Sequence, residues 1–293
     1  MESVSLLFAA SPERKSGIAT VLAVQQVRRM RGGTQSHLMC CSDRHAYVVK
    51  FQNNPQHLRI LANELLVVLL ARLVGLPVPE PVLVEVSDWL VQHTPEMTVH
   101  LARSTVPCKA GLQFGSRYAV NPLKGQVFDY LPANMLARVR NLETFAGILA
   151  IDKWTGNVDG RQAAFWRRMQ QRNYAAMFID NGYCFNGGEW DFPDLPLRGT
   201  YEQSLVYADV VGWNSFEPWL SKIEDMGRDV IAEAAAEIPL AWYEGDLSAL
   251  DNLVRTLVER RSKVRSLLTA FRLSVRRPFP NWGEEVRPQL AVV

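Results

Sequence analysis

The sequence is poor in the residues from which zinc sites and disulfide frameworks are built. Its 293 residues include four cysteines, Cys40, Cys41, Cys108 and Cys184, and none of them belongs to a C-x-x-C pair. The five histidines are scattered along the chain. These patterns argue against a zinc site and against disulfide bonds, and they fit a reducing cytoplasm.

Long apolar runs and a strong net charge are also lacking. The longest apolar run, residues 65–76, is interrupted by Arg72 and is too short to span a bilayer. The first three residues, Met-Glu-Ser, carry no basic region ahead of an apolar core, so no signal peptide is indicated. The net charge is only +2, which gives no electrostatic reason to bind nucleic acid or an anionic membrane. We therefore expect a cytoplasmic protein that binds neither.

The most informative stretch is residues 152–182, which carries three aspartates in two polar groups. Asp152 and Asp159 lie in the first group, which follows an apolar helix-like run. Asp180 lies in the second group, directly after another apolar run. Aspartates in such positions either end a local turn or take part in a site, and the segment between the two groups bears on that choice.

That segment has the pattern of a β-hairpin. Residues 163–169 and 174–179 are mostly apolar, and they flank a polar turn at 170–173. A hairpin returns its ends to one place, so Asp159 and Asp180 are expected to lie close together. Neighbouring carboxylates repel each other and are usually compensated by a cation, most often a metal ion. A simple turn-capping role for Asp180 remains the alternative.

A glycine-rich turn follows the first expected strand, residues 19–29. Residues 31–36 are RGGTQS, and two glycines followed by small hydroxyl and amide residues are typical of a loop or turn. The same composition would let backbone N–H groups approach a phosphate closely. Neither G-x-x-x-x-G-K-[ST] nor G-x-G-x-x-G is present. From these residues alone a plain hairpin turn is the favoured interpretation.

Two charged residues lie in apolar surroundings. Residues 37–41 and 46–51 are expected strands, and the second of them contains Lys50. Residues 58–74 predict a helix that is apolar nearly all round and contains Glu64. Because a buried charge is costly without a partner, one hypothesis is that the two pair with each other. The alternatives are a lysine whose head reaches water and a glutamate that points outward at the helix margin.

The composition predicts two domains and a tail. Pro, Asn and Gly occur together at residues 121–125, which is the clearest boundary signal in the chain. We therefore place an N-terminal lobe at residues 1–120, a C-terminal lobe at 121–275 and a loosely ordered tail at 276–293. Further strands are expected at 82–86 and 112–120, a short helix at 87–92, helices at 133–139 and 142–154, a long loop at 184–198, and mostly helix over 202–275.

The order of these elements predicts a bilobal phosphotransferase. The chain runs from a strand and the glycine-rich turn to the lysine strand, the glutamate helix, the linker and the aspartate-bearing hairpin. In such an enzyme the turn would cover the phosphates, Lys50 would hold their oxygens, and Glu64 would orient Lys50. Asp159 would face the acceptor hydroxyl, and Asp180 would bind Mg²⁺.

Six short segments make the comparison more specific. They are RGGTQS at 31–36, VVKF at 48–51, NELL at 63–66, GLPVPEP at 75–81, GNVDGR at 156–161 and FIDNG at 178–182. In their order and spacing, over about residues 20–270, the sequence resembles the HipA-like kinase family, bacterial relatives of the protein kinase and phosphatidylinositol kinase fold. The resemblance implies an α+β, bilobal protein-kinase-like fold. Its small N-terminal lobe would hold an antiparallel β-sheet and one helix, and its larger C-terminal lobe would be mainly helical.

The resemblance also implies ATP and Mg²⁺ as cofactors and a role for each matching residue. Lys50 would contact ATP, with Glu64 as its partner. Asp159 would be the catalytic aspartate and Asp180 the metal-binding one. The phosphate loop would consist of Gly32, Gly33, Thr34, Gln35 and Ser36.

Two positions depart from the family pattern. Many relatives have His where this chain has Arg161, and a metal-binding Asn where it has Ala164, which cannot bind a metal. Asn157 or Gln162 would then supply the missing metal ligand.

The identity of the base has an alternative as well. Asp152 and Asn157 form their own D-x-x-x-x-N set at the required spacing, with Asp152 as the base. We favour Asp159, because it directly precedes the hairpin.

The expected activity is transfer of the γ-phosphoryl group of ATP to a hydroxyl, on a protein Ser or Thr or on a small molecule. The best-known family members are toxins that phosphorylate a protein serine, which implies an antitoxin or a regulatory partner. A nucleotide-binding pseudokinase that regulates a partner is the alternative, and Ala164 favours it. The sequence shows no appended DNA-binding module, and too few residues precede the glycine-rich turn for the extra N-terminal subdomain of longer HipA proteins. We therefore expect the short, stand-alone form.

Overall fold

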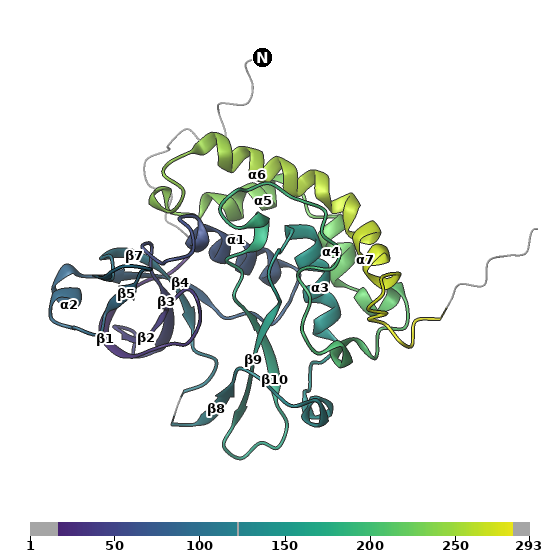
Figure 1. The fold of residues 1–293 in the computed structure, drawn as a ribbon, viewed down its shortest axis with the longest axis horizontal. Coiled ribbons are helices and arrows are strands. Elements are labelled where there is room, and N and C mark those ends of the chain that lie inside the picture. Colours follow the sequence, from purple (N-terminus) through teal and green to yellow (C-terminus); the bar gives the residue numbers. More distant parts are fainter. Residues whose placement is uncertain (1–16, 122, 284–293) are drawn as a thin grey trace, which may run out of the picture.

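The computed structural model describes residues 17–121 and 123–283. A closed five-stranded barrel lies beside a larger helical part, and a three-stranded sheet extends away from both (Figure 1). The first three residues, on which the prediction about a signal peptide rests, lie outside the described residues, and so does the last part of the predicted tail.

The elements have the following bounds. The strands are β1 (Thr20–Arg29), β2 (His37–Cys41), β3 (Ala46–Lys50), β4 (Pro81–Val86), β5 (Thr98–His100), β6 (Thr105–Pro107), β7 (Gly111–Arg117), β8 (Gly125–Phe128), β9 (Gln162–Arg168) and β10 (Ala175–Ile179). The α-helices are α1 (Ile60–Leu73), α2 (Asp88–Gln92), α3 (Thr144–Thr155), α4 (Trp219–Glu224), α5 (Arg228–Ala236), α6 (Leu247–Arg260) and α7 (Val264–Arg272). Short 3₁₀ turns are η1 (Ala133–Arg138), η2 (Cys184–Asn186), η3 (Ser204–Tyr207), η4 (Trp213–Phe216), η5 (Leu240–Trp242) and η6 (Arg261–Lys263).

The barrel runs in the order β1–β2–β3–β7–β4 and closes between β4 and β1. All neighbouring strands pair antiparallel except at this closure, where Thr20 pairs with Leu83 in a parallel register. The expectation of a purely antiparallel sheet is therefore wrong for one strand pair. β1 is ten residues long, so it pairs with β2 over its later part and with β4 at its start. The chain between β1 and β4 is long enough for a parallel connection.

The barrel encloses an apolar core of its own, to which alternate residues of β2, β3 and β4 contribute. The hairpin of β5 and β6 adds Met97 and Val99 to that core. The sequence did not indicate this hairpin, because its strands have three residues each. Three residues are too few for an alternation of apolar and polar side chains to be recognised. The short α2 was expected, and Ser87 caps it by accepting a hydrogen bond from the Leu90 N–H at 3.1 Å.

α1 lies between the barrel and the helical part and contacts both. It is buried nearly all round, as its sequence predicts, and packs against α3 and α5 on one side and β4 and β7 on the other. Leu83 and Phe114 of the barrel lie in the same apolar cluster as α1 and the helices. α1 thus joins the two parts, so residues on it can be held by both.

The second sheet has the order β10–β9–β8, and both of its strand pairs are antiparallel. The predicted hairpin is confirmed: β9 pairs with β10 so that Gln162 lies opposite Ile179. This register brings the start of β9 and the end of β10 together, which is where the two polar groups of the sequence meet. β8 was not recognised as a strand because it has only four residues.

The helices after residue 202 surround a core rich in aromatic side chains, to which the chain after α7 also contributes. Phe279 and Trp282 are buried there, with Phe216 against both rings at 5.9 Å between ring centroids. The prediction of a loose tail is therefore wrong for residues 276–283, because two large aromatic side chains anchor this segment. No helix in the described part of the chain is long and apolar enough to cross a membrane.

Candidate active site

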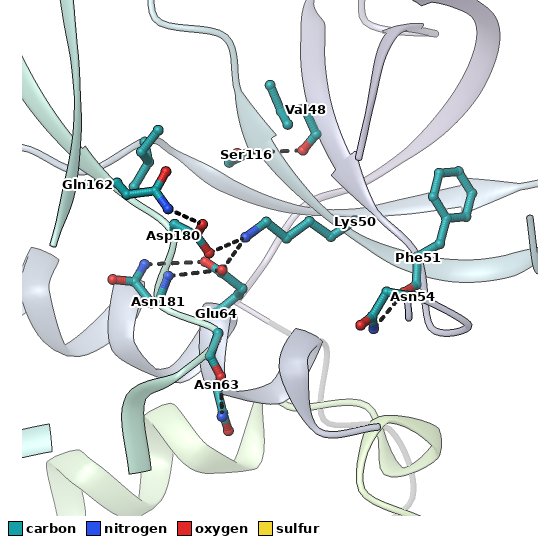
Figure 2. Close-up of polar contacts among 12 residues, drawn as sticks. Val48, Lys50, Phe51, Asn54, Asn63, Glu64, Ser116, Gln162, Asp180 and Asn181 are labelled. Atoms are coloured by element: carbon teal, nitrogen blue, oxygen red, sulfur yellow. Dashed lines mark hydrogen bonds and ion pairs between the residues drawn. The ribbon is translucent and has the colours of Figure 1, made fainter. Parts of the chain in front are cut away.

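Lys50, Glu64 and Asp180 meet at the inner end of a cavity, although they come from β3, α1 and the residue after β10. The Lys50 Nζ forms ion pairs with the Glu64 Oε1 and, at 2.9 Å, with the Asp180 Oδ1. Figure 2 shows the lysine side chain extending from its strand to both carboxylates. Lys50 and Glu64 are buried, whereas Asp180 is half-buried at the cavity wall. The hypothesis that the first two pair is confirmed, and Lys50 does not extend its head into water.

Lys50 and Asp180 hold each other ionised. Burial by itself lowers the pKa of Lys50, but the carboxylates of Asp180 and Glu64 outweigh it and raise that pKa above its usual value. Burial also acts to raise the pKa of Asp180, yet the Lys50 ammonium outweighs it and the pKa is lowered. Glu64 lies deeper, and burial raises its pKa. Asp180 is therefore an ionised carboxylate at neutral pH that faces the cavity.

The loop Asp180-Asn181-Gly182 is shaped by close contact with α1. Asp180 has a left-handed backbone with a φ of 62°, which Asp tolerates better than most residues. The Asn181 N–H donates to the Glu64 Oε1 at 2.9 Å, and its side-chain amide donates to the Oε2 at 3.3 Å (Figure 2). A Cβ at Gly182 would lie 2.5 Å from the side chain of Ile60. The Asp-Asn-Gly sequence thus allows the loop to lie directly against α1.

Asn63 fixes the continuation of this loop. Its side-chain amide donates to the carbonyl oxygens of Gly182, Cys184 and Gly187 at 2.7–3.0 Å. Its side-chain oxygen accepts a hydrogen bond from the Trp190 indole at 2.7 Å. We did not predict this role, although an asparagine in a helix that is otherwise apolar was a usable signal, because a buried amide needs partners.

Arg161 ties the two aspartate groups together. Its guanidinium forms a two-point ion pair with Asp152, with the Nε 2.9 Å from the Oδ2, and both side chains are fully buried. Its Nη1 donates to the carbonyl oxygens of Ile179 at 2.8 Å and Asp180 at 3.3 Å, and to the Asn181 Oδ1 at 3.0 Å. No sequence pattern predicts this clamp, because its partners are distant in the chain and three of its acceptors are backbone or amide oxygens.

Asp152 and Asn157 lie away from the cavity, in the interior behind the loop. The Asn157 side-chain amide donates to the Asp152 Oδ1 at 2.9 Å, and both residues are at most 3% exposed. The Asn157 Oδ1 accepts a hydrogen bond from the Asp159 N–H at 3.0 Å. Since their polar atoms are occupied by protein partners, neither side chain faces the space in which a substrate or metal would bind.

Asp159 lies on the outside of the same loop, and Gln162 begins the strand that follows it, β9. Asp159 is exposed, and its Oδ1 accepts a hydrogen bond from the Gly160 N–H at 2.7 Å. Gln162 lines the cavity, and its side-chain amide donates to the Asp180 Oδ2 at 2.8 Å. Ala164 also lines the cavity, because it is the second residue after Gln162 in β9 and lies on the same face of the strand.

The glycine-rich turn forms the cavity's outer wall. Gly32 has a φ of 121°, and a Cβ at Gly33 would lie 2.7 Å from the side chain of Gln56. Thr34 and Ser36 are buried and line the cavity.

Gln35, by contrast, anchors the turn rather than lining the cavity. Its side-chain oxygen accepts a hydrogen bond from the His100 N–H at 2.8 Å, and its side-chain nitrogen donates to the His100 carbonyl at 2.7 Å. The turn is thereby attached to β5, an element that the sequence analysis missed.

The cavity has a volume of about 640 Å³, within the range of roughly 300–1,000 Å³ that is usual for small-molecule sites. Its polar end holds the cluster and the hydroxyls of the turn. Its apolar lining comes from β3, α1, β7, β8 and β10, through Val48, Val68, Phe114, Val127 and Met177. Charged side chains such as Arg117, Asp129 and Glu202 line it as well. Such a cavity can take a molecule with a flat apolar end and an anionic end.

Comparisons with known proteins agree with this geometry. The family model for the HipA-like kinase matches residues 23–187. No curated protein is similar enough in sequence to count as a match. Among solved structures, the Helicobacter pylori proinflammatory kinase CtkA is similar with a TM-score of 0.52 and 12% identity, over 86% of this chain and 99% of that one.

Two further structures are similar at lower scores. One is HipA of Shewanella oneidensis in its complex with HipB and operator DNA, with a TM-score of 0.49 and 14% identity over 85% of this chain and 68% of that one. The other is the Golgi casein kinase, with a TM-score of 0.48 and 12% identity over 89% of this chain and 74% of that one.

The likeness to CtkA indicates a mixed α+β, kinase-like fold, and the family match covers more than half of the sequence, including the turn, Lys50, Glu64 and Asp180. On these grounds the chain belongs to the HipA-like kinase family.

Proposed function

We propose that this protein is an ATP- and Mg²⁺-dependent kinase that transfers the γ-phosphoryl group to a hydroxyl, most suitably that of a protein Ser or Thr. The observation that carries the proposal is the cluster of Lys50, Glu64 and Asp180 at the end of a cavity bounded by a glycine-rich turn. Family membership makes a kinase-type phosphotransferase the coarse class of activity. The nucleotide, the metal and the acceptor are our proposal.

The residues present fit a magnesium ion. In the described residues no three His, Cys, Asp or Glu side chains are grouped to hold a metal by themselves. Mg²⁺ commonly needs only one or two protein ligands, because waters and the phosphates of the substrate complete its octahedron. Asp180 would be the carboxylate ligand, and Gln162, whose side-chain amide contacts it in the cavity, would take the place of the missing asparagine. The ion would neutralise charge on the phosphate oxygens.

The protein's own groups supply the rest of the chemistry. Lys50, held by Glu64, would bind phosphate oxygens, and the N–H groups and hydroxyls of the turn would hold the phosphates from the other side. The acceptor oxygen forms a bond to the γ-phosphorus while the bond from that phosphorus to the β–γ bridging oxygen breaks. The proton of the acceptor hydroxyl passes to the Asp159 carboxylate. We choose Asp159 over Asp152 because it is exposed, whereas the oxygens of Asp152 are taken by Arg161 and Asn157.

The first test is nucleotide binding. We expect Mg·ATP at millimolar concentration to raise the melting temperature of the protein, and replacement of Lys50 by methionine to remove most of that shift. An exposed arginine in the turn between β5 and β6, Arg103, provides the control, since its replacement by methionine should leave the shift intact. No stabilisation of the wild type by any nucleotide with Mg²⁺ would contradict the proposal.

A second candidate function is a nucleotide-binding pseudokinase. Ala164 favours it, because it lines the cavity at the position where relatives carry a metal-binding asparagine. Both candidates predict nucleotide binding, so the two differ only in whether phosphoryl transfer follows.

Asp159→Asn is expected to lower the rate of phosphoryl transfer by about 10²–10⁴, the usual contribution of a general base, without changing nucleotide affinity. The carboxylate lies outside the Lys50 cluster, so binding does not depend on it. Single-turnover transfer of label from ATP, together with a titration of nucleotide affinity, measures the two effects separately. Asp209→Asn, at another exposed aspartate, is the control. A wild-type rate of phosphoryl transfer by Asp159→Asn would contradict Asp159 as the general base and favour Asp152.

Gln162→Ala is expected to raise the Mg²⁺ concentration needed for half-maximal nucleotide stabilisation by about tenfold or more, as is usual when a group that orients a metal ligand is removed. Its amide contacts Asp180 directly, so the variant removes a ligand or its support. Titration of Mg²⁺ at fixed ATP checks this, with Gln170→Ala, in the exposed hairpin turn, as the control. An unchanged Mg²⁺ requirement would remove Gln162 from the metal site.

A further inference from the structure

The far end of the three-stranded sheet is strongly basic, although the whole chain is nearly neutral. Two segments that meet there, residues 123–142 and 163–176, contain six Lys and Arg and a single acidic residue, Asp129. The cations are Lys124, Arg138, Arg140, Arg167, Arg168 and Arg172. With 32 basic and 30 acidic residues in all, the rest of the chain has more acidic than basic residues. We call this end of the sheet the basic tip.

Backbone pairing brings these segments together. Arg168 lies opposite Gly125 in the ladder of β8 and β9, and the Lys124 carbonyl accepts a hydrogen bond from the Met169 N–H at 3.1 Å. On the other side, the Tyr174 N–H donates to the Arg138 carbonyl, and the Arg140 N–H donates to the Tyr174 carbonyl, both at 2.9 Å.

The cations of the tip are available to a partner. Five of the six side chains are exposed, and Arg167 is half-buried on the Tyr174 ring, 5.1 Å from its centroid. Among the described residues, none of the six forms an ion pair. Arginine guanidinium groups bind carboxylates through two hydrogen bonds at once, so this surface suits an acidic partner.

The two edges of the sheet differ. The β10 edge is covered, because Asn141 exchanges two hydrogen bonds with the backbone of Ala176 and the Phe178 N–H donates to the Pro77 carbonyl at 2.8 Å. At the β8 edge, no hydrogen bond joins residues 126–128 of the described chain to any segment beyond β9. An open edge of this kind offers main-chain N–H and C=O groups to another extended polypeptide.

β8 also connects the tip to the cavity. It begins at Gly125, opposite Arg168, and ends at Phe128, while Val127, Asp129 and Tyr130 line the cavity. The distance along the four residues of β8 is about 13 Å at the usual rise of a strand. Figure 1 shows the strand running from the projecting end of the sheet toward the barrel and helices.

We propose that an acidic, extended segment of the protein substrate docks on the β8 edge, with its carboxylates at the basic tip and its acceptor hydroxyl a few residues away at the cavity. This inference rests on the proposed kinase function and names its substrate class. A polypeptide is the occupant because an open strand edge matches another main chain, which a nucleic acid or a lipid surface does not provide.

The test is binding of labelled peptides to the whole protein without nucleotide, followed by fluorescence anisotropy. The probe is an extended peptide of alternating glutamate and threonine, and the matched peptide has glutamine in place of glutamate. We expect the glutamate peptide to bind about tenfold more tightly, and we expect this advantage to shrink as salt is added. The double variant Arg168→Glu/Arg172→Glu should weaken its binding about tenfold. Arg44→Glu/Arg103→Glu, at exposed arginines in the β2–β3 and β5–β6 turns, is the matched control and should leave binding unchanged.

Backbone N-methylation of the peptide tests the strand edge without altering the protein. Two glutamate peptides are methylated at alternate residues in opposite registers, so that one of them loses the N–H groups that would face β8. We expect that peptide to bind about tenfold more weakly and the other to bind like the parent. Equal binding of both methylated peptides and the parent would overturn docking at the edge.

The remaining outcomes separate this inference from the proposed kinase function. Equal binding of the glutamate and glutamine peptides, or of the tip and control variants, overturns the inference. So does binding of duplex DNA or phosphatidylserine vesicles through Arg168 and Arg172 when the peptide does not bind. If Mg·ATP still raises the melting temperature in those cases, the kinase proposal stands and only the docking surface fails. Peptide binding without any nucleotide stabilisation would instead remove the kinase function and leave an acidic-peptide-binding surface.

Discussion

Replacement of Asp180 by asparagine is expected to lower the rate of phosphoryl transfer by about a thousandfold or more, because the metal ion that this carboxylate would hold would contribute several kcal/mol to the transition state. Asparagine is nearly isosteric but carries no charge, so it binds Mg²⁺ poorly. The remaining partner of Lys50, Glu64, keeps the ammonium paired. The fold should therefore survive the change. Single-turnover transfer of label from ATP measures the rate.

The control for this variant is Asp225→Asn, at an exposed aspartate that follows α4. It removes the same charge and should leave the rate unchanged. A Mg²⁺ titration adds a second readout, since the asparagine variant should need far more metal for nucleotide stabilisation. Transfer at the wild-type rate by Asp180→Asn would place the metal elsewhere and contradict the assignment of the site.

Arg161→Met is expected to lower the free energy of unfolding by about 3–5 kcal/mol, because it leaves the buried Asp152 carboxylate without its partner. Both side chains of the pair are fully buried, so water cannot take over the lost contacts. Among residues 17–121 and 123–283, the carboxylate then keeps only the Asn157 side-chain amide as a hydrogen-bond donor. The same change also releases the carbonyl oxygens of Ile179 and Asp180. Unfolding in urea, followed by fluorescence, measures the loss.

The double variant Asp152→Leu/Arg161→Met separates the two consequences. Replacing both members of a buried ion pair by apolar residues often restores stability, so the double variant should regain much of the loss. It should not regain full activity, because Arg161 also fixes the backbone of Asp180 and the Asn181 side chain. A double variant as unstable as Arg161→Met would show that the carbonyl contacts, and not the unpaired carboxylate, determine the cost. Wild-type activity in it would contradict a positioning role for Arg161.

The parts of the fold that the sequence predicts are those with a clear local pattern. The strands that became β2, β3, β4, β9 and β10, and the helices α1 and α3, were placed within a few residues, because apolar periodicity fixes which face is buried. β5, β6 and β8 have three or four residues each, too few for any period to show. The parallel closure of the barrel depends on which strands meet in space, and no local pattern encodes it.

The candidate site divides in the same way. Lys50 and Glu64 were linked because each is a charge inside an apolar element, and Asp180 was joined to them by the order of the elements. Arg161 was noted only as a departure from the family pattern, and its clamp on Asp152 could not be foreseen. The expected roles of Asn157 as a metal ligand and of Gln35 in the phosphate loop require side chains that face the cavity. The sequence does not determine which way a side chain in a loop points. Both point to protein partners and away from the cavity.

Phe279 and Trp282 show the limit of reasoning from composition. Three prolines and alternating charge are typical of a mobile end, and this segment has both. Two large aromatic side chains outweigh that tendency, because each buries a large apolar area against the helices. Aromatic residues in a proline-rich terminal segment are thus a signal for docking onto the fold.

The central claim is that the Lys50, Glu64 and Asp180 cluster serves phosphoryl transfer from Mg·ATP. It is tested most directly by incubating the protein with ATP labelled at the γ-phosphate, Mg²⁺ and a proteome extract treated to inactivate its own kinases. We predict that the wild type places label on Ser or Thr of an extract protein and that Asp180→Asn places none. An unlabelled extract with the wild type, under conditions in which Mg·ATP stabilises the protein, would contradict catalysis and favour the pseudokinase. Equal labelling by the wild type and Asp180→Asn would contradict the site.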